Sequence, residues 1–417
     1  MNKNKINWVA VLTMMFLFGM IAFVTNLAAP IGVIWKQAPG VEGSNFWGMM
    51  GNMMNFLAYA FMGIPAGKLI TRIGYKKTTL IGVGVGLIGV FVQFLSGKIG
   101  VGATLAGLPA NFFVYLLGAF VCGFSVCILN TVVNPMLNLL GGGGNKGNQL
   151  VQIGGTFNSL LGTLTPMLVG ALIGTVTKDT AITDVNTVLY IAMGVFAVTF
   201  LILTFIPFVE PEQEKTDVSV KALLKYKHLV FGVIAIFVYV GVEVGIPGTL
   251  NFFLTDTLGT ANAATTAGFV AGTYWFLMLI GRFVSSLISG KVSSRTQLAV
   301  TNAVAIALVI AAMFTTEVQA SMPVFTGTGF GMAQVPLTAL LLVCCGLCTS
   351  VMWGTIFNLS VEGLGKYSAL ASGLFMTMVV GGGVLPLIQN AIADATSYMA
   401  SYWVVVAALA YMLWFAL

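Results

Sequence analysis

The chain is built from apolar runs long enough to cross a lipid bilayer, and these runs constrain its fold more than any other feature. A spanning helix needs about 20 apolar residues, and short polar stretches divide the sequence into twelve such runs. The most polar stretch, Glu210 to His228, separates the sixth run from the seventh. We expect spans near 7–35, 46–69, 78–97, 109–140, 150–176, 185–208, 229–255, 264–290, 297–316, 334–359, 367–392 and 397–417.

Composition supports the same conclusion. Only 7% of the 417 residues are charged, and the mean hydropathy is +0.99. Soluble domains have about a quarter of their residues charged, so the outer surface of this chain must face lipid. The first run, from Ile6 to about Ile34, is longer than the roughly 7–15-residue core of a signal peptide. We interpret it as an uncleaved first helix of an all-α integral membrane protein.

Basic residues predict the orientation of the chain. With the amino terminus in the cytoplasm, fourteen basic residues fall on the inner side and three on the outer side, while Arg282 lies near a helix end. Such an excess is the usual signature of cytoplasmic loops. It predicts a multi-pass protein of a bacterial cytoplasmic (inner) membrane with both termini cytoplasmic. The excess of basic residues in cytoplasmic loops therefore explains the net charge of +6, and no nucleic acid partner is expected. The outer set is Lys36, Lys98 and Lys178; the inner set is Lys3, Lys5, Lys68, Arg72, Lys76, Lys77, Lys146, Lys215, Lys221, Lys225, Lys227, Lys291, Arg295 and Lys366.

A repeat relates the two sets of six runs. Asn26-Leu-Ala-Ala-Pro30 in the first run matches Glu243-Val-Gly-Ile-Pro247 in the seventh, and Gly67-Lys68 matches Gly290-Lys291. Repeated halves with a binding site between them are typical of secondary transporters. We expect two pseudo-symmetric six-helix bundles, 1–209 and 229–417, joined by a cytoplasmic linker, 210–228.

The loop after the second run carries a basic motif. Gly67, Arg72, Gly74, Lys76 and Lys77 have the spacing of the signature loop of the major facilitator superfamily, which this segment resembles. Thr71 stands where that pattern has an aspartate. The resemblance implies the major facilitator fold, and it implies that these five residues steady one conformation at the cytoplasmic side.

A closer resemblance extends over roughly residues 10–395. Asn130-Thr-Val-Val-Asn134-Pro135, Thr156-Phe157-Asn158-Ser159 and Ile280-Gly281-Arg282-Phe283 are similar to the fucose–proton symporter branch of that superfamily. Tyr239-Val-Gly-Val-Glu243 and Gly381-Gly382-Gly383-Val384-Leu385-Pro386 look like its glucose/galactose permeases. The resemblance implies uptake of a hexose, such as glucose, galactose or fucose, by alternating access and coupled to protons.

The chain departs from that branch at its titratable positions. By the surrounding motifs, Asn26 and Asn130 stand where the fucose symporters have an aspartate and a glutamate that carry protonation. Gly155 stands where that branch has a glutamine. Because asparagine does not titrate, the proton relay of the branch does not transfer to this chain.

Glu243 is the one carboxylate expected in the middle of a span. An ionisable group at bilayer depth costs at least about 2.5–3.5 kcal/mol and usually faces a cavity or a partner. We predict Glu243 as the ion-coupling residue, for protons or for sodium. Binding of a sugar hydroxyl, and a structural bond to a neighbouring helix, stay open as alternatives.

A sugar site needs amides for hydroxyl groups and an aromatic face for C–H groups. Buried amides are costly unless they are paired, so the many amides in the spans suggest a polar cavity. From this set and from the repeat we predict Asn26, Asn130, Asn158, Glu243 and Trp275 as substrate-binding residues. The wider set is Asn52, Asn55, Asn134, Gln152, Asn251, Asn358, Gln389 and Asn390, with Tyr274 and Trp353 as further aromatic candidates.

Other classes of function fit less well. The spans hold no Ser-His-Asp or paired-carboxylate arrangement, so we expect no enzyme and no cofactor. Cys344, Cys345 and Cys348 lie together but without a nearby His or carboxylate, so we expect packing and no metal. An uncoupled or sodium-coupled sugar transporter, and a multidrug exporter of the same fold, remain alternatives. Organophosphate exchange is disfavoured because no arginine is expected at mid-membrane, and we expect a monomer.

Overall fold

The computed structural model describes residues 8–140, 144–177, 179–206, 223–288, 292–325, 329–362, 364 and 368–417. The first half of these residues forms α1 (Trp8–Thr25), α2 (Ala28–Trp35), α3 (Asn45–Leu95), α4 (Ala110–Leu140), α5 (Gly144–Ile173), the 3-10 turn η1 (Ile182–Val185) and α6 (Asn186–Phe205). The second half forms α8 (Lys227–Thr257), α9 (Ala263–Ile288), α10 (Ser294–Met313), α11 (Leu337–Thr349), α12 (Met352–Val361), α13 (Ser368–Met378), α14 (Gly381–Ala395), α15 (Tyr398–Ser401) and α16 (Trp403–Ala416).

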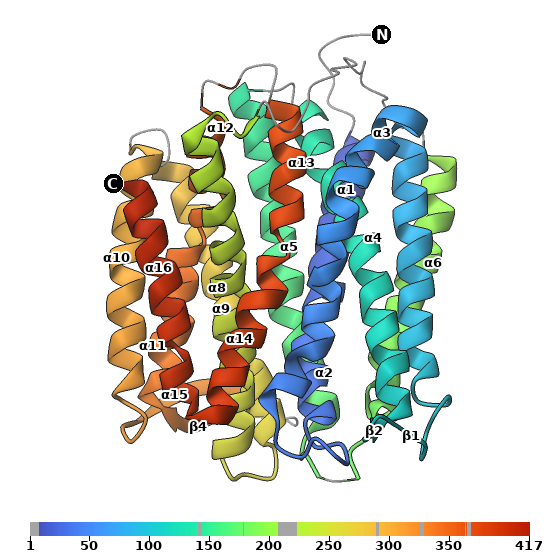
Figure 1. Cartoon of the computed structure of the whole chain (residues 1–417), viewed down its shortest axis with the longest axis vertical. Helices are drawn as coiled ribbons and strands as arrows, with labels where there is room; N and C mark the ends of the chain where they lie inside the picture. The colour runs from blue at the N-terminus through green and yellow to red at the C-terminus, as the bar shows by residue number, and fades with distance from the viewer. Residues whose placement is uncertain are drawn as a thin grey trace.

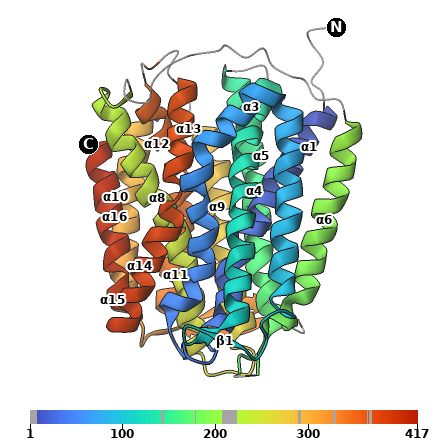
Figure 2. The same cartoon turned by 45° about the vertical axis from the view of Figure 1, so that its right-hand side comes forward.

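Within these ranges, 12 segments are long and apolar enough to cross a membrane. They stand side by side and nearly parallel to one axis (Figures 1 and 2). The predicted all-α membrane fold with twelve spans is therefore confirmed. Most of the predicted linker, 210–228, lies outside the described residues, so the domain boundaries stay a prediction.

The second and third spans together form α3, and the chain bends sharply between them at Gly74. This glycine has φ +84° and ψ 170° inside the helix. A side chain strains this conformation because its Cβ collides with the backbone. Gly74 therefore provides the reversal between the two spans, within the predicted signature loop.

Several spans are divided into two helices, and proline accounts for the break between α1 and α2. A proline removes a helix hydrogen bond and crowds the carbonyl four residues earlier. Pro30 does this to Asn26, and the chain changes from α1 to α2 at Asn26 and Leu27. Pro247 stands in the same relation to Glu243, but α8 continues past it as one helix. The first span is therefore interrupted at the matched proline, whereas the seventh is continuous.

The two ends of the bundle differ in structure. One end carries two short antiparallel hairpins, β1 (Thr104–Leu105) with β2 (Leu108–Pro109), and β3 (Gln319–Phe325) with β4 (Phe330–Pro336). We call this end the hairpin face. The opposite end, the termini face, holds the start of α1, the end of α16 and the bend of α3 (Figure 1). The sequence did not predict either hairpin.

Two main sets of helix contacts join the halves of the chain. α5 packs along α9, and α3 packs against α14 and α13. At the hairpin-face end of the α5–α9 contact, a Cβ at Gly170 would lie 3.2 Å from Cα of Gly268, and one at Gly268 would collide with the carbonyl oxygen of Pro166. Small residues allow such close approach where water supplies no hydrophobic drive. The halves therefore touch backbone to backbone at this point.

Candidate functional site

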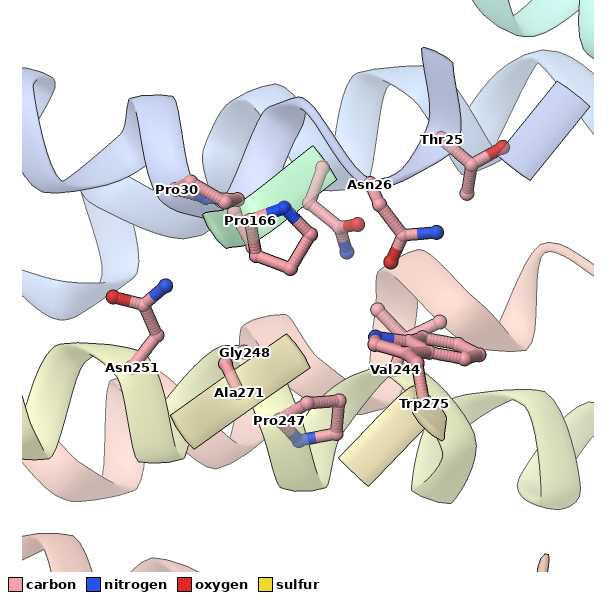
Figure 3. Close-up of a pocket in the computed structure, with 12 residues that line it drawn as sticks. Thr25, Asn26, Pro30, Pro166, Val244, Pro247, Gly248, Asn251, Ala271 and Trp275 are labelled. Atoms are coloured by element: carbon pink, nitrogen blue, oxygen red, sulfur yellow. The ribbon is translucent and has the colours of Figure 1, made fainter. Parts of the chain in front are cut away.

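A small cavity lies between the halves in the middle of the bundle. Its walls come from the α1–α2 break, α2, α3 and α5 on one side and from α8 and α9 on the other. Figure 3 shows Asn26 facing Trp275 across this space, with Asn251 at its other end, opposite Pro30. The lining residues are Thr25, Asn26, Ala29, Pro30, Asn52, Pro166, Val244, Pro247, Gly248, Asn251, Ala271 and Trp275.

Three amides and one indole give the cavity its chemical character. The amide nitrogen of Asn26 donates to the carbonyl of Ala22, and that of Asn52 donates to the carbonyl of Gly382. These bonds fix the side chains through their nitrogen atoms. Asn251 receives a weak bond from the hydroxyl of Thr255 at 3.3 Å. The site thus combines amide groups with the ring of Trp275, which suits a polar ligand that also has an apolar face.

The two matched prolines of the repeat meet at this cavity. Pro30 and Pro247 both line it, from opposite halves, and Pro166 of α5 joins them (Figure 3). Interrupted helices at a binding site are typical of secondary transporters, because the irregular backbone lines a cavity instead of lipid. The internal repeat therefore marks the cavity in space.

The cavity is small. About 20 Å³ is free within it, which is room for about one or two water molecules. A larger solute enters only when the walls contributed by the two halves move apart. The structure thus holds the site in a contracted state.

The predicted binding residues divide into two groups. Asn26 and Trp275 line the cavity. Asn130 and Asn158 are not among its lining residues: the amide of Asn130 donates to the hydroxyl of Tyr59, and that of Asn158 donates to the carbonyl of Phe18. Their role in binding stays a prediction. Asn52 and Asn251, which belonged only to the wider amide set, line the cavity in their place.

Glu243 lies beside the cavity and holds an ion pair. Its neighbour Val244 lines the cavity, while its own Oε1 accepts a 3.0 Å hydrogen bond from Tyr239 and lies 3.6 Å from Nη2 of Arg282. The side chains of Glu243 and Arg282 are 14% and 15% exposed. This carboxylate is therefore paired within the bundle, as a costly buried charge requires.

Arg282 lies near the end of its span, as the sequence predicted, but its side chain points inward. Its guanidinium reaches Glu243, which lies well inside the 31-residue α8. Arg282 belongs to the span Ala263–Ser285, and its long side chain carries the charge inward. The charge of Arg282 thus lies well inside the bundle. Glu243 and two groups of α5 bind it there.

The predicted gating loop is only partly engaged. Lys76 donates to the carbonyl oxygens of Thr204 and Ile206, at 2.9 Å each, and so holds the end of α6 within the same half. Arg72 and Lys77 are exposed. The conformational role of this loop stays a prediction, with Gly74 as its bend.

Charged residues join the two halves at the hairpin face. Lys36, which the sequence placed in an outer loop, is fully buried, and its Nζ lies 2.6 Å from Oδ2 of Asp256. Nζ also donates to Oδ1 of Asn45 at 2.7 Å and to the hydroxyl of Tyr398 at 3.0 Å. Burial lowers the pKa of Lys36 below its usual value, while the carboxylate of Asp256 opposes this fall. The ammonium group lies over the ring of Phe252 as well.

Asp394 forms a second connection beside the first. Its carboxylate, at the end of α14, accepts bonds from the Ser44 hydroxyl at 2.8 Å and from the amides of Asn45 and Phe46 at 2.8 and 2.9 Å. These donors belong to the start of α3, where a helix favours negative charge. The cluster that joins the halves here, which we call the hairpin-face lock, consists of Lys36, Ser44, Asn45, Asp256, Asp394 and Tyr398.

Relatives share this chain over most of its length. It is 30% identical over 372 residues to the glucose/galactose transporter of Brucella abortus, covering 87% of this chain and 82% of that protein. It is 22% identical over 372 residues to the L-fucose-proton symporter of Escherichia coli, covering 82% and 77%.

Solved structures share the fold. A variant of the Escherichia coli fucose:proton symporter matches with a TM-score of 0.69 and 19% identity, covering 99% of this chain and 98% of the other. A nucleoside transporter matches with a TM-score of 0.66 and 14% identity, covering 98% of each chain. The sequence pattern of the Major Facilitator Superfamily matches residues 11–385. With its twelve spans and the cavity between its halves, the chain belongs to the Major Facilitator Superfamily of membrane transporters.

Proposed function

We propose that this protein imports a hexose across the bacterial cytoplasmic membrane by alternating access. The observation that carries the proposal is the cavity between the halves, which the amides of Asn26, Asn52 and Asn251 line together with Trp275. Amides exchange hydrogen bonds with hydroxyl groups in both directions, and an indole ring covers the C–H face of a sugar. The names of the 30% identical relatives support glucose and galactose as the first sugars to test.

Proton coupling through Glu243 is the second part of the proposal. The Glu243 carboxylate lies beside the cavity, on the side toward the termini face. Protonation would remove its charge and ease movement of the loaded carrier, because an ionised group is costly to desolvate. The L-fucose-proton symporter among the relatives supports this reading. Sodium coupling and uncoupled transport remain the alternatives.

The proposed orientation follows from the basic loops. The termini face would lie in the cytoplasm and the hairpin face outside, with the protein acting as a monomer. Arg282 is already bound by Glu243 and α5, which argues against its use as a phosphate-binding residue. The three amides of the lining argue against a multidrug exporter, whose pocket would hold fewer of them.

Flux into proteoliposomes tests the substrate. Purified protein is given radiolabelled glucose, galactose and fucose, with an imposed proton gradient, a sodium gradient or none. We expect accumulation of at least one hexose only with the proton gradient. Accumulation indifferent to both gradients would favour uncoupled transport, and no hexose flux in a folded protein would refute the proposed substrate.

The variant Glu243→Gln tests the coupling residue. We expect it to abolish proton-driven accumulation while sugar exchange continues, because exchange needs no net release of protons. Persistent proton-driven accumulation in this variant would refute the assignment of Glu243.

A further inference from the structure

Arg282 binds both halves of the protein at once. Its Nη1 donates to the carbonyl oxygen of Gly155 and to the hydroxyl of Ser159, each at 2.9 Å, and both acceptors belong to α5. Its Nη2 lies 3.6 Å from Glu243 of α8, in its own half. Within the described residues, this guanidinium therefore has its hydrogen bonds in one half and its counter-charge in the other.

The sequence of α5 leaves space for this contact. A Cβ at Gly155 would lie 3.5 Å from Nη1 and 3.9 Å from Cδ of Arg282, so any longer side chain would compete with the guanidinium. Ser159 is buried and presents its hydroxyl to the same nitrogen. The glycine and the serine lie four residues apart, on one face of the helix.

The contact lies between the cavity and the termini face. Trp275 lines the cavity, and Arg282 follows it by seven residues along α9, or about 10 Å of helix. On α8, the cavity extends from Val244 to Asn251, so Glu243 also lies on the termini-face side. A solute moving between the cavity and that face must pass this level.

The charge on Glu243 decides how Arg282 is held. When the carboxylate is ionised, it neutralises the guanidinium from within the same half. When it is protonated, the guanidinium is a buried charge whose hydrogen-bond acceptors, among the described residues, are Gly155 and Ser159. Because leaving a buried charge without partners is costly, protonation makes the bonds to α5 more necessary.

Among the described residues, the other groups that contact the pair of Glu243 and Arg282 are uncharged. The phenols of Tyr239 and Tyr274 interact with the carboxylate, and Tyr239 also meets the carbonyl of Thr349 on α11. α11 further contributes the thiols of Cys345 and Cys348 around Tyr274. Other segments packed on α8 bring uncharged groups near this level, including Trp353 of α12, Gln389 of α14 and Tyr402, which lies between α15 and α16.

We infer that Arg282 is a positioning residue that transmits the charge of Glu243 to the other half: protonation strengthens the tie to Gly155 and Ser159, and ionisation weakens it. The inference rests on the proposed role of Glu243 in coupling. In the sugar-free carrier a proton would thus close α9 on α5, and the loaded carrier would still move with a neutral Glu243. The tie also gives a function to the glycine at position 155.

Distance measurements between the halves test the tie without any sugar. Spin labels are placed at Phe205 and Arg295, exposed positions at the ends of α6 and α10 on the termini face, in a chain whose five cysteines are replaced. Lowering pH from about 8 to about 5 spans the range in which a buried carboxylate titrates. We expect the shorter distance to gain population by about tenfold, the effect of one charge-assisted hydrogen bond.

Four variants and one control make the test specific. Glu243→Gln should show the shorter distance at every pH, and Arg282→Gln should show the longer one at every pH. Ser159→Ala and Gly155→Gln should weaken the pH response while leaving both charges in place. The matched control, Thr165→Val, lies on the same helix, but its hydroxyl bonds the carbonyl of Leu161 in that helix, so it should respond like wild type.

The outcomes separate this inference from the proposed function. A wild-type distance that ignores pH, or an Arg282→Gln protein that responds normally, would overturn the tie. A protein that shows the expected pattern but carries no hexose in the flux assay would overturn the proposed substrate and leave the tie standing.

Discussion

The substitution Asp256→Asn should open the hairpin face. It keeps the size of the side chain but removes the negative charge that faces the buried ammonium of Lys36. Breaking a buried ion pair costs about 3–5 kcal/mol. Asp256 is 32% exposed, and Asn45 and Tyr398 remain as acceptors. We therefore expect about 2–3 kcal/mol, which shifts the ratio of closed to open forms by about 30–150-fold.

Spin labels at Leu105 and Thr260 measure this shift, because both positions are exposed on the hairpin face in different halves. The population at the short distance should fall in Asp256→Asn. It should recover in the double variant Lys36→Met/Asp256→Asn, since removing both charges leaves none unpaired. Asp184→Asn is the matched control, because this carboxylate accepts a bond from Ala181 within one half.

Two results would refute this reasoning. One is a distance distribution in Asp256→Asn that equals that of wild type. The other is a double variant as open as the single one, which would mean that the unpaired ammonium is not what opens the face.

Three further predictions concern the cavity and the backbone. Asn251→Ala should weaken sugar binding by about 1–3 kcal/mol in calorimetry, whereas Asn302→Ala, whose amide bonds its own helix, should leave affinity unchanged; equal affinities in both would place the sugar elsewhere. Gly268→Leu should separate α9 from α5 and abolish flux while the protein still folds, and normal flux would contradict the close contact. Gly74→Ala should lower thermal stability by about 1–3 kcal/mol, and an unchanged melting temperature would show that the bend tolerates a side chain.

The spans and the repeat were readable from the sequence because both depend on local patterns. Twenty apolar residues fix a helix in lipid, and a proline perturbs its own turn wherever it stands. Pro30 and Pro247, which the repeat matches, both line the cavity in the structure. Of the five predicted binding residues, the two that line it are Asn26 and Trp275.

The ion pairs and hydrogen bonds between distant segments could not be predicted from the sequence. Lys36 looked like an outer-loop residue, and its partner Asp256 lies 220 positions away. Arg282 lies seven residues beyond Trp275, and only the packing of α5, α8 and α9 shows where its guanidinium points. Contacts of this kind depend on the relative rotation of helices, which hydropathy does not encode.

The glycine contact between α5 and α9 can serve as the pivot about which one half rotates against the other. Gly268 touches α5 near one end of the helix pair, and Arg282 binds it fourteen residues further along, a distance of about 21 Å. A rotation of about 10° about the glycine contact would therefore move the guanidinium by about 4 Å over this arm. Such a displacement exceeds the 2.9 Å length of its bonds to Gly155 and Ser159. A tilt small enough to leave the pivot packed is thus sufficient to release the far end completely.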